Sequence, residues 1–406
     1  MVTAQFNPLG PEALANPYPM YKALREEAPV SWNDIFEAWI FTRHADVDAV
    51  LMHPRFSADR SRAQTRFAEM IRKQQEEFGP FSTSPTMLTS DPPEHTRLRR
   101  LVSKAFTPRA VENLRPRIRQ IVCGLLDGFQ GRSEFDLVEE IAYPLPVIVI
   151  AEMLGVPPED RADFKRWSDD VVATLGGPFT PPDVIARARA SIEELVAYLA
   201  EQIAERRTAP RDDLISGLIA AEDGGQVLSE QEIYSTTILL LIAGNETTTN
   251  LIGTAMYSLL QNPDQLELLR NEPALMPGAI EELLRFNGPV QATGRVALED
   301  IEIGGTTVKE NQTALVLLGA ANHDPAKFPD PEKLDLRRNP TEHMAFGDGI
   351  HFCIGAPLAR AEAGIAFEEI LKRYPRIEAA GDPTWGGTFI IRGPKKLPLR
   401  VASQAG

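Results

Sequence analysis

Cysteine is almost absent from this sequence: its 406 residues include only Cys123 and Cys353. Two thiols are too few for a disulfide framework or for a zinc site built from four thiolates. Cys123 lies in an apolar run and is most simply explained as a small core residue. Cys353 has a different setting, because three glycines accompany it in residues 346–355, FGDGIHFCIG.

Long apolar runs and an excess of positive charge are missing too. The longest apolar stretch, residues 141–154, is broken by two prolines and carries Glu152, so no span of about 18 apolar residues exists. No basic segment followed by an apolar one opens the chain, and we expect a cytoplasmic protein without a membrane span. With 42 basic and 57 acidic residues the net charge is −15, which argues against nucleic-acid binding as the main function.

No linker, repeat or block of charge divides the chain, so we expect residues 1–406 to form a single domain. Short strand patterns occur at residues 30–32, 38–41, 313–318 and 388–392. Apolar residues at three-and-four spacing predict helices at residues 45–52, 98–106, 118–129, 148–154, 185–203 and 365–374. The predicted fold class is mainly α with minor β sheets (α+β).

The longest predicted helix covers residues 229–262. Ser229 and Glu232 form a capping box at its start, and its length of about 33 residues corresponds to about 50 Å. Its first half is apolar nearly all round, which is typical of a buried helix. Residues 244–250, GNETTTN, then place a glycine, an acid and three threonines at its centre. Hydroxyls that bond back to carbonyls can open a helix at a functional site, although close helix packing also explains the glycine.

Cys353 precedes a predicted helix that begins near Pro357. Free N–H groups and the positive end of the dipole at a helix start stabilise a thiolate, so Cys353 is a candidate metal ligand or nucleophile. The neighbouring glycines indicate backbone that turns through positive φ or lies against something flat. A nucleophile paired with His351 and a structural thiol are the alternatives, but a catalytic thiol normally needs a base that a third group orients.

Several motifs together resemble those of the cytochrome P450 family, in its soluble bacterial form. Residues 346–355 match the haem-ligand signature F-G-x-G-x-H-x-C-x-G, residues 243–247 match the oxygen-activation motif A-G-x-(D/E)-T, and residues 282–285 match E-x-x-R. Residues 91–100 and 321–325 also match, and the motifs occur in the family's order. The resemblance implies the cytochrome P450 fold, with a long central helix over a buried haem.

The resemblance also implies a haem b cofactor and the residues that hold it. The Cys353 thiolate would bind the iron. On the opposite face, Glu246 and Thr247 would deliver the protons that O2 reduction consumes. The other cofactor contacts that the resemblance implies are His95, Arg99, Arg295 and His351 at the propionates, with Ala243, Phe346 and Gly355 nearby.

Two further expectations concern hydrogen bonds inside the fold. The resemblance implies that Glu282 and Arg285 form a buried triad with a later arginine, for which Arg338 fits the spacing better than its rival Arg337. Thr248 and Thr249 are expected to bond back to helix carbonyls.

The implied activity is that of a monooxygenase which hydroxylates or epoxidises a largely hydrophobic small organic molecule with O2. Pocket-facing positions are mainly apolar, and Gln291 and Thr293 are expected to orient one polar group of an uncharged substrate. Residues 176–182, rich in glycine and proline, would form a mobile lid. The rival interpretations are a thiolate-haem gas sensor or carrier and a peroxide-driven oxidase, but the Glu246-Thr247 pair favours the monooxygenase.

Electrons are expected from a separate ferredoxin or flavodoxin with its reductase. Arg100, Lys104 and Arg109 follow the predicted propionate contacts and would form a basic docking surface for this acidic partner.

Overall fold

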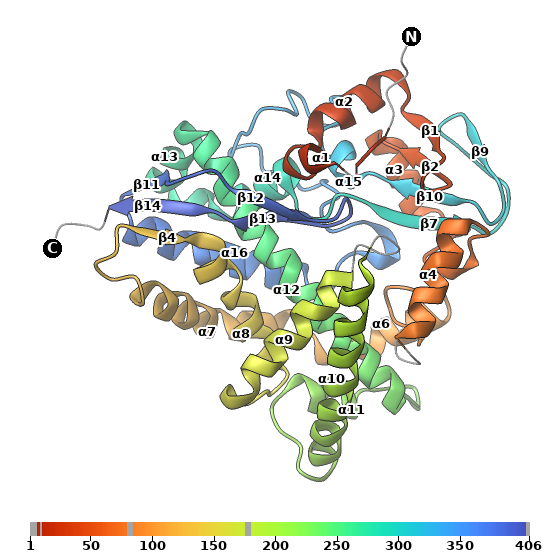
Figure 1. Cartoon of the computed structure of the whole chain (residues 1–406), viewed down its shortest axis with the longest axis horizontal. Coiled ribbons are helices and arrows are strands. Elements are labelled where there is room, and N and C mark those ends of the chain that lie inside the picture. The colour runs from red at the N-terminus through yellow and green to blue at the C-terminus, as the bar shows by residue number, and fades with distance from the viewer. Residues whose placement is uncertain (1–5, 9, 79–83, 175–179, 403–406) are drawn as a thin grey trace.

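The computed structural model describes residues 6–8, 10–78, 84–174 and 180–402 (Figure 1). Most of the predicted lid, residues 176–182, falls outside these ranges. One long helix runs through the middle of the molecule, with a group of helices below it and the sheets above it in the view of Figure 1. None of the helices in the described ranges combines the length and the apolar character that crossing a bilayer requires.

Every helix predicted from apolar spacing is confirmed, but the helices predicted to start at residues 118 and 365 start well before, at Pro108 and Ala356. The sequence order is α1 (Pro11–Ala15), α2 (Tyr18–Glu27), α3 (His44–Met52), α4 (Arg66–Glu77), α6 (Glu94–Ala105), α7 (Pro108–Asp127), α8 (Pro144–Met153), α9 (Arg161–Val172), α10 (Pro182–Thr208), α11 (Leu214–Ala220), α12 (Glu230–Gln261), α13 (Pro263–Asn271), α14 (Met276–Asn287), α15 (Leu318–Ala321) and α16 (Ala356–Arg373).

The largest sheet has five strands in the order β1-β2-β10-β7-β3. Its strands are β1 (Val30–Asn33), β2 (Ala38–Phe41), β3 (Phe56–Ser57), β7 (Thr293–Ala297) and β10 (Thr313–Val316). The predicted hairpin of β1 and β2 is confirmed, and β10 runs parallel to β2. Pairing of β3 with β7 places Ser57 opposite Val296, so the chain that leaves β3 runs beside the start of β7.

The remaining sheets are small. They are β11 (Arg376–Ala379), β14 (Pro398–Ala402) and β4 (Glu134–Asp136) as one sheet, and the hairpins β12 (Thr384–Gly387) with β13 (Arg392–Lys396), β8 (Ile301–Ile303) with β9 (Thr306–Val308), and β5 (Glu222–Asp223) with β6 (Gln226–Val227). The strand predicted at residues 388–392 is displaced. Residues 388–391 form the turn between β12 and β13, where the Thr388 N–H donates to the Ile391 carbonyl at 2.7 Å, and β13 starts only at Arg392.

Helix α12 has 32 residues and the predicted capping box, in which the Ser229 N–H donates to Glu232 Oε2 at 2.8 Å. It remains helical through residues 244–250, so the central threonines do not open it. Strand β13 lies directly against this helix: a Cβ on Gly253 would lie 2.7 Å from Pro394 Cγ, and a Cβ on Gly393 would lie 2.3 Å from Asn250 Oδ1. The two glycines therefore let helix and strand interlock.

Candidate active site

Cys353 lies between the 3-10 turn Gly349–His351 and the start of α16. Its N–H donates to the Phe346 carbonyl at 3.0 Å, and the N–H groups of Gly355 and Ala356 donate to its sulfur. The loop thus folds back on itself around a thiol at a helix start, as the sequence predicts.

The glycines of this loop have separate tasks. Gly347 and Gly349 adopt φ of +71° and +67°, which confirms the predicted positive φ. A Cβ on Gly349 would lie 3.1 Å from the Leu51 carbonyl oxygen, so this glycine lies against the end of α3. A Cβ on Gly355 would lie 3.8 Å from Cys353 Sγ, close to the sulfur.

The Cys353 side chain borders open space inside the molecule. It is exposed to solvent, yet burial raises the pKa of its thiol. A side chain that lies deep in the fold and borders a hollow has both properties. Helix α12 shows the same pattern at its centre, where Ala243 is exposed although the following Asn245 and Glu246 are buried. The sulfur and the centre of α12 thus both face space that protein atoms leave free.

The four side chains predicted to contact the propionates lie close together. His95 and Arg99 occupy one face of α6, and the rings of His95 and His351 lie 4.3 Å apart. Arg295 of β7 is near enough to lower the pKa of both histidines, after the larger effect of burial. Arg99 is near enough to Cys353 to favour its thiolate. Four different segments therefore contribute to one cluster.

One carboxylate, that of Asp91, lies near this cluster and opposes the effect of burial on the pKa of His95, Arg295 and His351. Within the described residues neither Arg99 nor Arg295 forms an ion pair, and no partner binds either ring nitrogen of His95 or Nδ1 of His351. Arg295 Nη1 donates only to the Gly294 carbonyl at 2.9 Å and to Thr293 Oγ1 at 3.5 Å. Burial lowers the pKa of Arg295 to about 10 and that of His351 to about 4.

These unpaired groups fit haem b. Buried polar groups without partners cost free energy, and such sites normally hold a ligand or water. Guanidinium and imidazole groups can bind the two propionates, and the accessible Cys353 sulfur can bind the iron. A dianionic cofactor would therefore neutralise the cluster.

Sequence reasoning missed an ion-pair chain behind the loop of residues 346–355 that carries Cys353, here called the thiol loop. Arg360 donates twice to Glu281, at 2.7 Å each, and His343 Nε2 lies 3.0 Å from the same carboxylate. Although burial opposes it, these hydrogen bonds lower the pKa of Glu281 to about 2. The Arg360 guanidinium also lies 4.6 Å from the centre of the Phe346 ring. Arg360 lies in the second turn of α16, the helix that Cys353 precedes, and this placement is the signal that was available.

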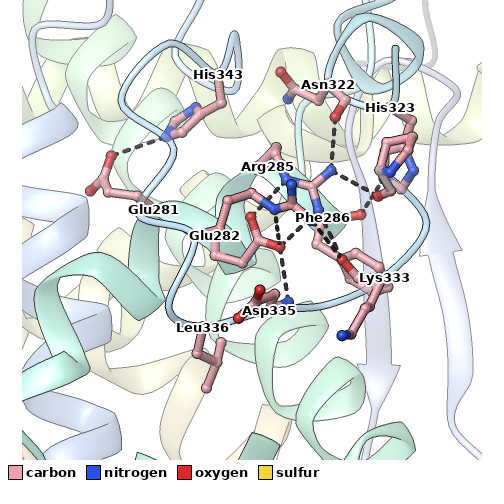
Figure 2. A network of polar contacts seen from close by, with 12 residues as sticks. Glu281, Glu282, Arg285, Phe286, Asn322, His323, Lys333, Asp335, Leu336 and His343 are labelled. Atoms are coloured by element: carbon pink, nitrogen blue, oxygen red, sulfur yellow. Dashed lines mark hydrogen bonds and ion pairs between the residues drawn. The ribbon is translucent and has the colours of Figure 1, made fainter. Parts of the chain in front are cut away.

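The Glu282 triad is built as expected, and Figure 2 shows its polar contacts. Arg285 donates to the two oxygens of Glu282 at 2.7 and 2.8 Å, and both side chains are fully buried. Arg338 Nε completes the triad at 3.2 Å, whereas Arg337 pairs with Glu272. Arg285 also donates to the carbonyls of Asn322 and Pro331 at 2.9 Å.

Glu246, at the centre of α12, is connected to solvent. Its Oε1 accepts from Lys395 Nζ at 2.6 Å and from Asn250 Nδ2 at 3.0 Å. The Lys395 side chain is 47% exposed and that of Glu246 is 10% exposed. Both line a cavity of about 630 Å³ whose wall also includes Tyr143 and Asp169. Lys395 therefore links a nearly buried acid to the outside.

The threonines beside Glu246 differ from the prediction. Thr247, rather than its successors, bonds back to the helix, with its hydroxyl 2.6 Å from the Ala243 carbonyl. The expectation for Thr249 is wrong, because its buried hydroxyl has no partner in the described part of the chain. Thr249 faces the 630 Å³ cavity instead.

Two other expectations concern side chains that already have protein partners. Arg100 and Lys104 share one carboxylate, that of Asp223, at 3.1 and 2.9 Å, so Asp223 compensates one of the three charges of the predicted docking surface. Gln291 is fully buried and donates to the Gly288 carbonyl at 2.6 Å, where it packs against Gly319. Its Oε1 is buried without a partner in the described part of the chain, so its role towards a ligand stays a prediction.

Known proteins resemble the chain over nearly its whole length. The family model described as Cytochrome P450 matches residues 49–382. Cytochrome P450 107B1 of Saccharopolyspora erythraea is 46% identical, with 94% of each chain covered. The 6-deoxyerythronolide B hydroxylase of the same species is 39% identical, with 95% of this chain and 96% of the relative covered. The solved structure of CYP109Q5 from Chondromyces apiculatus has a TM-score of 0.90 at 41% identity, with both chains fully covered.

The thiol loop at the start of α16, the cluster of cationic side chains without ion pairs beside it and these similarities agree. The chain belongs to the cytochrome P450 family of haem b monooxygenases.

Proposed function

We propose that this enzyme hydroxylates or epoxidises a largely hydrophobic small organic molecule, with electrons from a separate ferredoxin and its reductase. Haem, when bound, supplies the activation of O2. The side chains of this protein would hold that group, admit protons, exclude bulk water and orient the substrate. Cys353 would bind the iron, and His95, Arg99, Arg295 and His351 would hold the propionates.

The observation that carries the proposal is the placement of Glu246. Its carboxylate bonds to half-exposed Lys395, while most of the Glu246 side chain is buried at the centre of α12. The carboxylate can therefore exchange a proton with solvent. The hydroxyl of the next residue, Thr247, donates its hydrogen bond to the Ala243 carbonyl. The lone pairs of that hydroxyl remain free to accept a hydrogen bond from a water molecule.

Such an arrangement is what proton delivery needs. Glu246 would take up protons from the outer cavity, and Thr247 would hold the water that receives them. A gas sensor or carrier consumes no protons and has no use for this connection. The pair therefore supports the monooxygenase over the sensor.

The character of the pocket supports a hydrophobic substrate. Leu240 and Ala243 of α12, together with Leu88, are apolar, and Ala243 and Leu88 are exposed. One curated relative is named for hydroxylating 6-deoxyerythronolide B. Apolar pockets with a few placed polar groups are typical of sites for molecules of this kind.

The electron donor would dock beside the thiol loop. Ile350 is 53% exposed and Met52 is 56% exposed, and Met52 Sδ lies 3.2 Å from where a Cβ on Gly349 would be. The two side chains thus give this end of the molecule an exposed apolar surface, which is typical of a protein contact. Of the predicted cations, Arg109 keeps its charge unpaired among the described residues.

The test is turnover under ¹⁸O2. Haem-loaded protein, a bacterial ferredoxin, its reductase and NADPH are incubated with a panel of apolar compounds, and products are analysed by mass spectrometry. We expect one ¹⁸O atom per product. Turnover only with added peroxide would identify a peroxide-driven oxidase, and ligand binding without any product would favour the sensor.

A further inference from the structure

Arg60 is a cation without a counter-charge. It begins the 3-10 turn Arg60–Arg62 just after β3, and its Nη2 donates to Thr293 Oγ1 at 3.2 Å. No carboxylate forms an ion pair with it in the ranges that the structure describes. Arg62, two residues later, pairs with Asp59 at 3.3 Å. The two arginines look alike in the sequence but differ in their surroundings.

The guanidinium of Arg60 lies deep in the fold and still faces open space. Burial lowers its pKa, while its side chain remains exposed to solvent. A guanidinium that lies deep in the fold and is still accessible to solvent borders an internal hollow. The neighbouring Gly294 makes room for it, because a Cβ there would lie 3.7 Å from Arg60 Nε.

No carboxylate of the described residues accounts for Arg60. The Asp91 carboxylate acts on Arg295, whereas burial is the cause that lowers the pKa of Arg60. Arg60 is close enough to Arg295 to lower the pKa of that arginine, after burial. A guanidinium without a carboxylate beside it is costly away from bulk water.

We infer that Arg60 and Thr293 bind the carboxylate of the substrate, which is a carboxylic acid with a long apolar chain. This inference rests on the proposed function and specifies its substrate class. Arg60 can donate two parallel hydrogen bonds to a carboxylate, a geometry that guanidinium groups favour. Thr293 already accepts from Arg60, and its own proton is free for the same ligand. The apolar chain would extend from Arg60 towards the exposed Ala243 of α12. The uncharged substrate predicted from the sequence is thereby replaced by an amphipathic acid.

The experiment compares dodecanoic acid with dodecanol on the haem-loaded full chain. Affinities are measured by the low-to-high-spin shift and, independently, by calorimetry. The acid should bind about 10- to 100-fold more tightly than the alcohol, as expected for a charge-assisted pair in a sheltered site. Arg60→Leu should abolish this preference by weakening the acid alone. Arg62→Leu is the matched control and should keep it.

Three results would overturn the inference. Equal affinity for acid and alcohol in the unaltered protein is the first, and a preference that survives in Arg60→Leu is the second. The third is a lower haem-to-protein ratio in Arg60→Leu, which would assign this arginine to the cofactor. Failure of the proposed function looks different: acid binding would remain dependent on Arg60, while no ¹⁸O would enter any product.

Discussion

Arg285 and Arg295 are both buried arginines, but their surroundings differ. Arg285 donates to both oxygens of Glu282 and to two backbone carbonyls (Figure 2). Among the described residues Arg295 donates hydrogen bonds only to Thr293 and Gly294 of its own strand. The first guanidinium is fully satisfied by protein atoms, whereas the second has no ion-pair partner in the described ranges.

The same contrast separates two regions of the molecule. Around α14 the polar groups of Glu281, Glu282 and Arg285 all have protein partners. Around the thiol loop, His95 and Arg295 are buried with few partners or none. The α14 region should be complete in the apoprotein, while the thiol-loop region becomes complete only with haem and substrate. Anything that binds the native state alone adds to its stability, so haem should stabilise mainly the second region.

The largest effect is expected from Cys353→Ser, which removes the proposed iron ligand. The reduced protein with carbon monoxide should lose the strongly red-shifted Soret band, and product should become undetectable. Cys123→Ser is the control, because this half-buried thiol lies outside the site and donates a hydrogen bond to Glu369 at 3.6 Å. A normal band in Cys353→Ser would refute the assignment.

A matched pair of substitutions tests the contrast directly. Arg285→Lys should lower the free energy of unfolding of the apoprotein by about 3 kcal/mol, because lysine cannot reproduce the buried two-point contact with Glu282. Arg295→Lys should cost the apoprotein less than about 1 kcal/mol but speed the transfer of haem to apomyoglobin. Denaturant titration and haem-transfer kinetics measure the two effects. Equal losses of apoprotein stability would remove the distinction between the two regions.

Glu246→Gln tests whether the centre of α12 is built for proton delivery. The turnover number should fall about 100-fold, the range typical of a lost acid-base group, while substrate affinity stays the same. Lys395→Met should show a smaller decrease, since water can still reach the carboxylate. Glu139→Gln alters the same cavity but pairs with Lys396, so it should turn over normally. A Glu246→Gln variant with full product yield per O2 would exclude the proposed relay.

Acid titration tests the α14 region, in which the polar groups have protein partners. The pKa of Glu281 is lowered from 4.5 to about 2, so its ionised form stabilises the fold above about pH 4.5 and loses this contribution as pH falls towards 2. Glu281→Gln should remove about 1–3 kcal/mol of that pH-dependent stability. Denaturant titrations from pH 5 to pH 3 compare variant and parent. Parallel curves would show that the ion-pair chain adds no stability.

The smallest effects are expected within the thiol loop. Gly347→Ala and Gly349→Ala both force alanine into positive φ, at a cost of about 1–2 kcal/mol. Gly349→Ala should cost more, because its Cβ would approach the Leu51 carbonyl, whereas nothing lies within 4 Å of that position at Gly347. Thermal unfolding compares the two, and an equal loss would show that α3 moves to make room.

Much of the fold was readable from local pattern. The ends of α12 followed from the capping box and the proline, because both act within one turn of helix. The grouping of His95, Arg99, Arg295 and His351 was predicted only through family resemblance. Spacing along the chain cannot show that four segments meet.

Pairs of residues that are far apart along the chain could not be predicted from the sequence, for a physical reason. Lys395 is 149 positions from Glu246, and no local rule pairs them. The pairing of Arg100 and Lys104 with Asp223 arises in the same way, from packing of α6 beside the β5–β6 hairpin. Arg60 and Arg62 have similar neighbours in sequence, and only the hollow distinguishes them.

The interlock between α12 and β13 limits how this protein can change over generations. At Gly253 any side chain would collide with Pro394, and at Gly393 any side chain would collide with Asn250. Asn250 also donates to Glu246, so a mutation that enlarges Gly393 disturbs the acid as well as the packing. A single substitution at either glycine is therefore not tolerated. This arrangement can change only through paired substitutions, one in the helix and one in the strand.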